Sequence, residues 1–164
     1  MSRLDSFIRR LEAQRACLNH AVGLVAGLPG PVFEFGLGNG RTYDHLRETC
    51  PGRALYVFER KVAAHPDCVP GPDHLFLGAL DRTLPQAAAR FAGQVALVHS
   101  DLGCGDARID AQVSALVAAH LPRLLAPGAV VVADQDVGFA GARALALPDG
   151  VASKRYFLFR NQPT

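Results

Sequence analysis

The sequence has no pair of closely spaced cysteines. Its four cysteines, at positions 17, 50, 68 and 104, are widely separated, and no two of them form a Cys-x-x-Cys pair. Structural zinc sites and the disulfide frameworks of small secreted domains depend on such spacing. We therefore expect neither a zinc site nor a disulfide scaffold, and the simplest interpretation is reduced thiols in a cytoplasmic protein.

Long apolar runs are also missing. No run approaches the roughly 18 residues that a membrane-spanning helix needs. The first six residues, Met-Ser-Arg-Leu-Asp-Ser, carry charges where a signal peptide would have its apolar core. We expect a soluble protein that is not exported, with a cytoplasmic location and no membrane partner.

Neither sign of charge is in large excess. The formal net charge is +2 over 164 residues, and the arginines are scattered along the chain. Because a nucleic-acid groove gathers basic residues on one face, we expect no nucleic-acid partner. No internal repeat or low-complexity tract is present, and the length suits one well-buried core. We predict a single domain over 1–164, with an N-terminal helix in 1–28 and a core in 29–164.

What the chain does contain is a glycine-rich turn between a strand and a helix. Residues 32–35 are Val-Phe-Glu-Phe, glycine occupies 36, 38 and 40, and a helical pattern follows over 41–49. Glycine permits a sharp turn and a close approach of the backbone to a ligand, and a helix N-terminus directs free N–H groups at that place. The third glycine follows the second by two residues, where the dinucleotide fingerprint requires three. An NAD-dependent reductase is therefore disfavoured.

Further strands and helices alternate after this turn. Strands are predicted at 54–59, 73–80, 94–100 and 129–134, and helices at 83–91 and 106–125. Prolines at 66, 70 and 72 prevent a full crossover helix over 61–72, and few residues remain for one after 134. Residues 143–147 and 154–160 are predicted as two strands joined through the Pro-Asp-Gly turn at 148–150.

The N-terminal helix has an apolar stripe with a polar interruption. The stripe recurs every seven residues at Leu4, Leu11, Leu18 and Val25. Gln14 and Arg15 lie at the middle of the stripe. Side chains that reach the rim explain them, and a ligand-facing Arg15 is the alternative.

Acidic residues end several of the predicted strands. Glu59 ends the second strand 23 residues after Gly36, and in Rossmann-like sheets an acid at this separation accepts hydrogen bonds from ribose hydroxyls. Arg60 follows it, and its guanidinium suits either an adenine face or solvent. Asp101 ends the fourth strand and opens the glycine-rich loop 101–106, at the sheet edge where ligands bind.

Together these features resemble the class I S-adenosylmethionine methyltransferases. The resemblance rests on the acidic-x-Gly-x-Gly-x-Gly pattern over 34–40, on Glu59, and on the Leu-Leu-x-Pro-Gly phrase at 124–128 before the fifth strand. It implies an α/β fold with a Rossmann-like, doubly wound, mostly parallel seven-stranded sheet and an antiparallel C-terminal hairpin. The reduced crossover helices and the added N-terminal helix are features of this chain.

The resemblance also implies a cofactor and the residues that bind it. S-adenosyl-L-methionine would lie with its methionine part along 36–40, its amino group on Glu34, directly or through water, and its ribose on Glu59. In this family an acidic residue just after the third strand contacts adenine, whereas this chain has Ala79. Backbone groups of Ala79 and Leu80, or Asp81, would replace that contact. The implied cofactor-binding residues are Glu34, Gly36, Leu37, Gly38, Asn39, Gly40, Thr42, Glu59, Arg60, Gly78, Ala79, Leu80 and Asp101.

The expected function is methyl transfer to a small-molecule acceptor. In-line transfer from a sulfonium needs mainly positioning, and a base only where the nucleophile requires one, which agrees with the absence of a Ser-His-Asp set. The catalytic candidates are Asp101 and Asp134. In catechol-type O-methyltransferases two acids and an amide at these places hold magnesium, so Asp101, Asp134 and Gln135, with Asp136 nearby, are weak candidate ligands. We expect no metal, although magnesium is possible.

Two further expectations concern activity and assembly. The alternative to an enzyme is a non-catalytic module or regulatory subunit that binds S-adenosylmethionine.

The reduced crossovers leave sheet surface and hairpin side chains such as Phe157 and Phe159 without obvious cover. We therefore expect a homo-oligomer that buries this surface.

Overall fold

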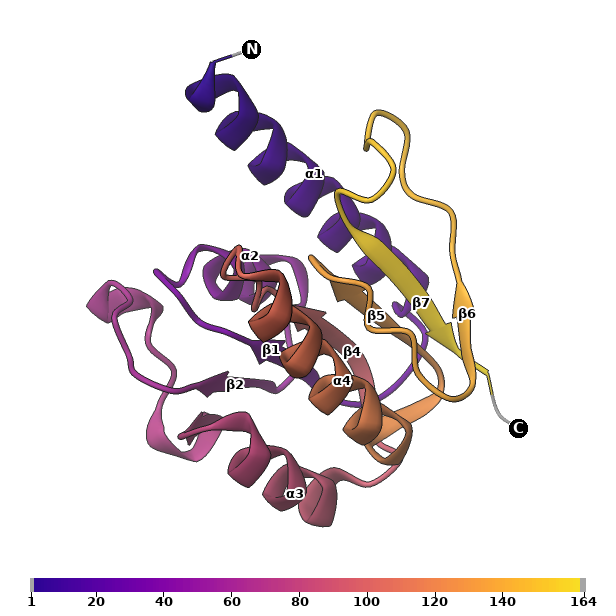
Figure 1. The fold of residues 1–164 in the computed structure, drawn as a ribbon. Coiled ribbons are helices and arrows are strands. Elements are labelled where there is room, and N and C mark those ends of the chain that lie inside the picture. The colour runs from indigo at the N-terminus through magenta and orange to yellow at the C-terminus, as the bar shows by residue number, and fades with distance from the viewer. Residues whose placement is uncertain (1, 163–164) are drawn as a thin grey trace.

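The structure is a computed structural model that describes residues 2–162. Its centre is one seven-stranded sheet with helices on both faces (Figure 1). In the described part of the chain, no helix is long and apolar enough to cross a membrane. The elements in chain order are α1 (Arg3–Leu24), β1 (Val32–Phe35), α2 (Arg41–Thr49), β2 (Leu55–Glu59), η1 (Pro66–Cys68), η2 (Pro72–His74), β3 (Leu75–Leu77), α3 (Leu80–Phe91), β4 (Val95–Ser100), α4 (Ala107–Leu124), β5 (Leu125–Ala133), β6 (Ala142–Ala144) and β7 (Phe157–Asn161).

The strand order is β3-β2-β1-β4-β5-β7-β6. The first five strands are parallel to one another, β7 runs antiparallel to β5, and β6 runs antiparallel to β7. This confirms the predicted Rossmann-like α/β sheet with antiparallel C-terminal strands. All parallel strands end at one edge of the sheet, so the loops after β1, β2, β4 and β5 meet there.

Helices on both faces explain why the central strands are continuous apolar runs. Every residue of β1 and β4 is buried, as expected when a parallel sheet is covered twice. On one face, Phe33, Phe58 and Phe91 form an aromatic cluster with α3 and α4. On the other, Val32 and Leu97 pack in a second cluster with α1 and α2. Burial of each such side chain is worth about 1.5–3 kcal/mol.

Helix α1 confirms the added N-terminal helix. Ser2 and Asp5 form a capping box at its start, and Cys17 and Leu18 bury its C-terminal half against the sheet. The N-terminal half projects past the sheet (Figure 1). There Phe7 is 44% exposed, so this half is free to border a site at the carboxyl edge of the strands.

Two predicted boundaries around the third strand were wrong. The strand is Leu75–Leu77 rather than 73–80, because η2 occupies its predicted start and Gly78 turns away with φ +141°. Helix α3 then begins at Leu80 rather than 83 and contains Pro85. The predicted absence of a full crossover helix after β2 is confirmed, since two short 3₁₀ turns stand in its place.

The C-terminal strands are shorter than predicted. β6 is Ala142–Ala144 rather than 143–147, and β7 is Phe157–Asn161 rather than 154–160. The predicted turn is present, with the Val151 N–H donating to the Pro148 carbonyl at 3.1 Å. It lies inside a longer loop, 145–156, in which the Leu145 N–H still donates to the Leu158 carbonyl of β7 at 2.9 Å, while the side chains of Leu145, Leu147 and Val151 pack onto the cluster that includes α1.

The side chains expected to lack cover are packed within this chain. Phe159 is 9% exposed and its ring lies 6.2 Å from that of Phe139. Val137 joins the same cluster, and Phe157 packs against it. The segment after β5 thus covers this face, which removes the argument that led us to expect a homo-oligomer and leaves assembly as a prediction.

Candidate functional site

The glycine turn after β1 lies at the carboxyl edge of the sheet. Gly36, Gly38 and Gly40 all have positive φ values, of +90°, +52° and +85°. A Cβ on Gly36 would lie 2.8 Å from the Asp101 carbonyl oxygen, and one on Gly40 would overlap the side chain of Cys68. A Cβ on Gly38 would meet nothing within 4 Å. Two of these glycines are therefore required by close packing, whereas the middle one faces open space.

Glu59 holds the glycine turn in place from the end of β2. Its Oε2 accepts hydrogen bonds from the Leu37 N–H at 2.9 Å and the Gly38 N–H at 3.2 Å. Its Oε1 accepts from the N–H groups of Arg60 at 2.7 Å and Lys61 at 3.1 Å. One carboxylate thus ties the turn after β1 to the turn after β2.

Glu34 lies beneath the turn and has no exposed surface. The Thr42 hydroxyl donates to its Oε1, and its Oε2 lies 2.8 Å from Nδ1 of His99 on the neighbouring strand β4. Burial alone would lower the pKa of His99, but the adjoining Glu34 carboxylate outweighs burial and the pKa is raised. The Glu34–His99 pair, bonded to the Thr42 hydroxyl, therefore supports the start of α2 from below.

An open cleft of about 400 Å³ lies above the turn. We call it the glycine-loop cleft. Its sheet side is formed by six of the predicted residues: Gly36, Leu37, Gly38, Asn39, Thr42 and Asp101. Its other side is formed by α1, through Phe7, Arg10, Leu11 and Gln14. The sequence thus identified the sheet side of this cleft, and α1 supplies the side that it did not.

Asp101 connects the end of β4 to α1. Its Oδ1 accepts a hydrogen bond from Arg10 at 2.7 Å and its Oδ2 accepts one from Gln14 at 2.9 Å. Gln14 is 6% exposed, so the polar residue in the apolar stripe is explained by this contact. Arg15, the alternative ligand-facing residue, is exposed. Arg10 was missed by the sequence analysis; its position one helical turn before Gln14 was the available signal.

Asp134 ends the adjacent strand, β5. Its carboxylate accepts hydrogen bonds from the Leu102 N–H at 3.2 Å and the Gly103 N–H at 2.9 Å. Burial raises the pKa of Asp134, and the nearby charge of Asp101 raises it further, while these N–H groups act in the opposite direction. The two catalytic candidates therefore lie close enough to interact, as neighbouring strand ends predict.

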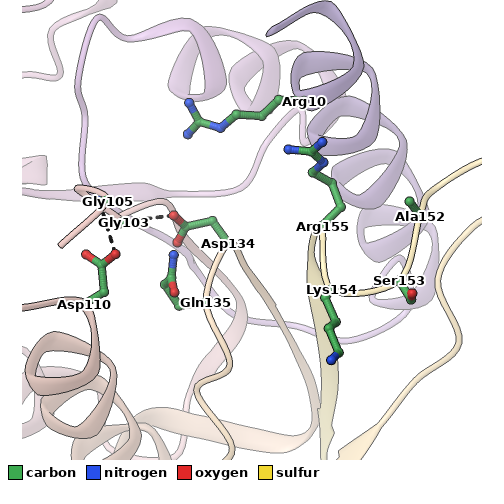
Figure 2. A pocket seen from close by; sticks show the side chains of 10 residues that line it. All are labelled: Arg10, Gly103, Gly105, Asp110, Asp134, Gln135, Ala152, Ser153, Lys154 and Arg155. Atoms are coloured by element: carbon green, nitrogen blue, oxygen red, sulfur yellow. Dashed lines mark hydrogen bonds between the residues drawn. The ribbon is translucent and has the colours of Figure 1, made fainter. Parts of the chain in front are cut away.

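A second cleft, of about 420 Å³, opens on the far side of Arg10. We call it the Asp134 cleft. Figure 2 shows Asp134 and Gln135 on one side of it, Arg155 on the other, and Arg10 at the top. Arg10 lines both clefts, so the Arg10–Asp101 pair stands between them.

A family model described as S-adenosyl-L-methionine methyltransferase matches residues 1–161 of the chain. The chain belongs to this family. S-adenosyl-L-methionine is therefore its cofactor, and the resemblance noted in the sequence is confirmed.

Solved structures agree with this assignment. A crystal structure of an S-adenosyl-L-methionine methyl transferase from Silicibacter pomeroyi DSS-3 is 45% identical over 98% of this chain and 99% of that chain, with a TM-score of 0.92. The aminoglycoside resistance methyltransferase NpmB1 is 13% identical over 90% of this chain and 93% of that chain, with a TM-score of 0.53. A variant of the 16S rRNA (adenine(1408)-N(1))-methyltransferase from Catenulisporales acidiphilia with cosubstrate SAM is 13% identical over 88% and 91%, with a TM-score of 0.50. The last two show the fold only. No curated protein matches the chain.

The glycine-loop cleft of this methyltransferase fits its cofactor. The open space at Gly38 admits a ligand against the backbone of the turn, and the carboxylate of Asp101 borders the cleft. A carboxylate suits the positive charges of a sulfonium and an α-amino group. Glu34 does not reach this cleft as a free carboxylate, since both its oxygens are bonded beneath the turn.

The other predicted cofactor residues lie farther along the carboxyl edge of the sheet, after β2 and β3. Arg60 is exposed after β2, and the Gly78 N–H donates to the Glu59 carbonyl at 2.9 Å. Ala79 is the N-cap of α3 and offers no side-chain cap. Asp81, in the first turn of α3, is exposed, so the adenine contact stays a prediction that falls either to backbone groups of Ala79 and Leu80 or to Asp81.

The weak metal candidates have protein partners. Within residues 2–162, no group of three or more His, Cys, Asp or Glu side chains is arranged to hold a metal ion. Asp101 faces the positive charge of Arg10, and both oxygens of Asp134 face backbone N–H groups. Arg10 thus supplies the positive charge that a cation would bring to these two carboxylates.

Proposed function

We propose that this methyltransferase transfers the methyl group of S-adenosyl-L-methionine to a small-molecule acceptor bound in the Asp134 cleft. The observation that carries this proposal is the pair of clefts on either side of Arg10. One borders the glycine turn and the other borders Asp134. The Asp134 cleft, at about 420 Å³, falls within the roughly 300–1,000 Å³ of small-molecule sites.

The cofactor supplies an electrophilic methyl carbon on a positively charged sulfur. The residues of the chain position the two reactants. Glu59 fixes the backbone of the glycine turn, and the Glu34–Thr42 bond fixes the start of α2 behind it. Asp101, which follows β4, holds α1 against the glycine-loop cleft through its bonds to Arg10 and Gln14.

Asp134 is the group best placed to serve the acceptor. It lines the Asp134 cleft, and burial raises its pKa, which makes its carboxylate a stronger proton acceptor than an exposed aspartate. When the acceptor is methylated, this carboxylate would accept the proton that the nucleophilic atom of the acceptor loses.

The experiment measures S-adenosylhomocysteine formation with a panel of hydroxyl, thiol and amine acceptors. Asp134→Asn should lower kcat by roughly 100-fold and leave the melting-temperature shift with S-adenosylhomocysteine unchanged. Asp136→Asn makes the same chemical change at a neighbouring residue that is exposed and does not line this cleft. This variant should keep full activity. Equal loss in both variants, or methylation of RNA but of no small molecule, would contradict the proposal.

A further inference from the structure

The Asp134 cleft has one acidic wall and one basic wall. Asp110 and Asp134 line one side, and Lys154 and Arg155 from the loop before β7 line the other. Figure 2 shows Asp110 and Asp134 on one side of the cleft and the 152–155 turn on the other, with the Arg155 side chain extending toward Arg10. The two walls differ in whether their charges already have partners.

The acidic wall is satisfied by the protein. Asp110 accepts hydrogen bonds from the Cys104 N–H at 2.8 Å and the Gly105 N–H at 3.2 Å, and these bonds lower its pKa. Asp134 accepts two further N–H groups, from Leu102 and Gly103. Both carboxylates therefore have their oxygens directed at backbone donors.

The side chains of the basic wall lack bonding partners within the described part of the chain. The side chains of Lys154 and Arg155 have no hydrogen-bond or ion-pair partner among residues 2–162, and both are exposed. The charge of Arg10, above them, is matched by Asp101 at 2.7 Å. The formal charges of the two walls cancel, but Lys154 and Arg155, two consecutive residues, are the charged side chains lining this cleft that have no bonding partner among residues 2–162.

These two residues are held by a defined turn. Lys154 is the one non-glycine residue with a positive φ, +63°, in the described part of the chain, a strained conformation that is retained where the surroundings impose it. The Arg155 N–H donates to the Ala152 carbonyl at 3.2 Å. Tyr156, which follows at once, is 1% exposed and anchors the turn in the core under α1.

We infer that the acceptor carries an anionic group, a carboxylate or a phosphate, which Lys154 and Arg155 bind while the atom to be methylated faces Asp134. This inference rests on the proposed function, because it places the acceptor in the Asp134 cleft. Lys154 and Arg155 have no bonding partner among residues 2–162 and can therefore bind an anionic group of the acceptor. The oxygens of Asp110 and Asp134 already accept hydrogen bonds from backbone N–H groups, so they are less suited to bind a cationic acceptor. A phosphate and a carboxylate share this chemistry.

The first test measures anion binding without knowing the acceptor. Wild-type protein saturated with S-adenosylhomocysteine is titrated with inorganic phosphate or with acetate at constant ionic strength, and the melting temperature is recorded. The double variant Lys154→Gln/Arg155→Gln should lose most of the anion-dependent shift. Arg123→Gln, which removes one exposed charge at the end of α4, should behave as wild type. The larger of the phosphate and acetate shifts identifies the type of anion.

The second test uses turnover. Each acceptor of the panel is supplied as its free acid, its phosphate ester and its neutral amide, and only the anionic forms should be methylated efficiently. In the double variant, KM for the anionic acceptor should rise roughly tenfold, with little change in kcat.

The outcomes separate this inference from the proposed function. Equal anion-dependent shifts in wild type and double variant, equal turnover of neutral and anionic forms, or an effect seen only with an RNA oligonucleotide would overturn the inference. Loss of the shift with S-adenosylhomocysteine itself, or no product with any acceptor despite normal anion binding, would count against the proposed function instead.

Discussion

Replacement of Gly38 by alanine tests where the cofactor binds, because the chain offers a matched control. Gly38 and Gly52 both have positive φ values, of +52° and +79°, and a Cβ on either would meet nothing within 4 Å. Gly38 lies at the glycine-loop cleft after β1. Gly52 lies before β2, at the opposite edge of the sheet. The two substitutions therefore have the same cost for the backbone and differ in what the new methyl group faces.

The expected magnitudes follow from this match. A side chain in a left-handed conformation costs about 1–2 kcal/mol, which lowers the melting temperature of a domain of this size by about 2–8 °C in both variants. At a cofactor concentration of ~100 times the dissociation constant, binding adds about 2.7 kcal/mol, or about 5–11 °C. If Gly38→Ala weakens binding ~100-fold, the binding term falls to about 0.4 kcal/mol, or about 1–2 °C.

Differential scanning fluorimetry with S-adenosylmethionine, S-adenosylhomocysteine and NAD measures these shifts. Wild type and Gly52→Ala should show the full shift with the first two compounds and none with NAD, and Gly38→Ala should show almost none with any. If Gly38→Ala keeps the shift of Gly52→Ala, the cofactor does not lie against this turn. The assignment of the glycine-loop cleft would then be refuted, although the family membership would stand.

Four further predictions concern other groups. Glu59→Ala removes the acceptor of four backbone N–H groups, so cofactor affinity measured by calorimetry should fall roughly ten- to a hundredfold; unchanged affinity in a folded variant would contradict the role of Glu59. Activity should persist in excess EDTA, because Arg10 faces Asp101; loss that magnesium restores would place the metal there. The pKa of His99 is raised above 6.5 by Glu34, so its stabilising effect is present below that pH and is lost as pH rises through the raised value; urea midpoints of His99→Gln should lack this fall. Light scattering should give a mass well above the 17.4 kDa of one chain if the predicted homo-oligomer forms, and a mass that stays at one chain on concentrating would end that prediction.

The parallel strands of the sheet were predictable because strands buried on both faces are continuous apolar runs. The glycine turn was predictable for a similar reason, since only glycine satisfies its dihedral angles and its contact with Asp101. The loop 145–156 was not, because the packing of Leu145 and Leu147 under α1 depends on contacts with distant parts of the chain. Local turn signals gave the place of the turn and overestimated the lengths of the strands around it.

Contacts over long sequence separations limited the prediction of the site in the same way. Glu34 was identified as an acidic residue beside the glycines, but its partner His99 is 65 residues away. Arg10 is 91 residues from Asp101, and in the local pattern only its position one helical turn before Gln14 distinguishes it from the other arginines of α1. A polar residue in an apolar stripe, Gln14, was the one visible indication that α1 faces a polar site.

Helix α1 gives the site its charge balance. Asp101 and Asp134 end adjacent strands, and two carboxylates this close would repel each other as both ionise. Arg10 offsets the charge of Asp101 directly, and the Leu102 and Gly103 N–H groups stabilise the charge of Asp134. Because Arg10 also lines both clefts, displacement of α1 would open the wall between them and leave Asp101 unpaired. The added N-terminal helix is therefore part of the catalytic site that we propose, as well as a cover for the sheet.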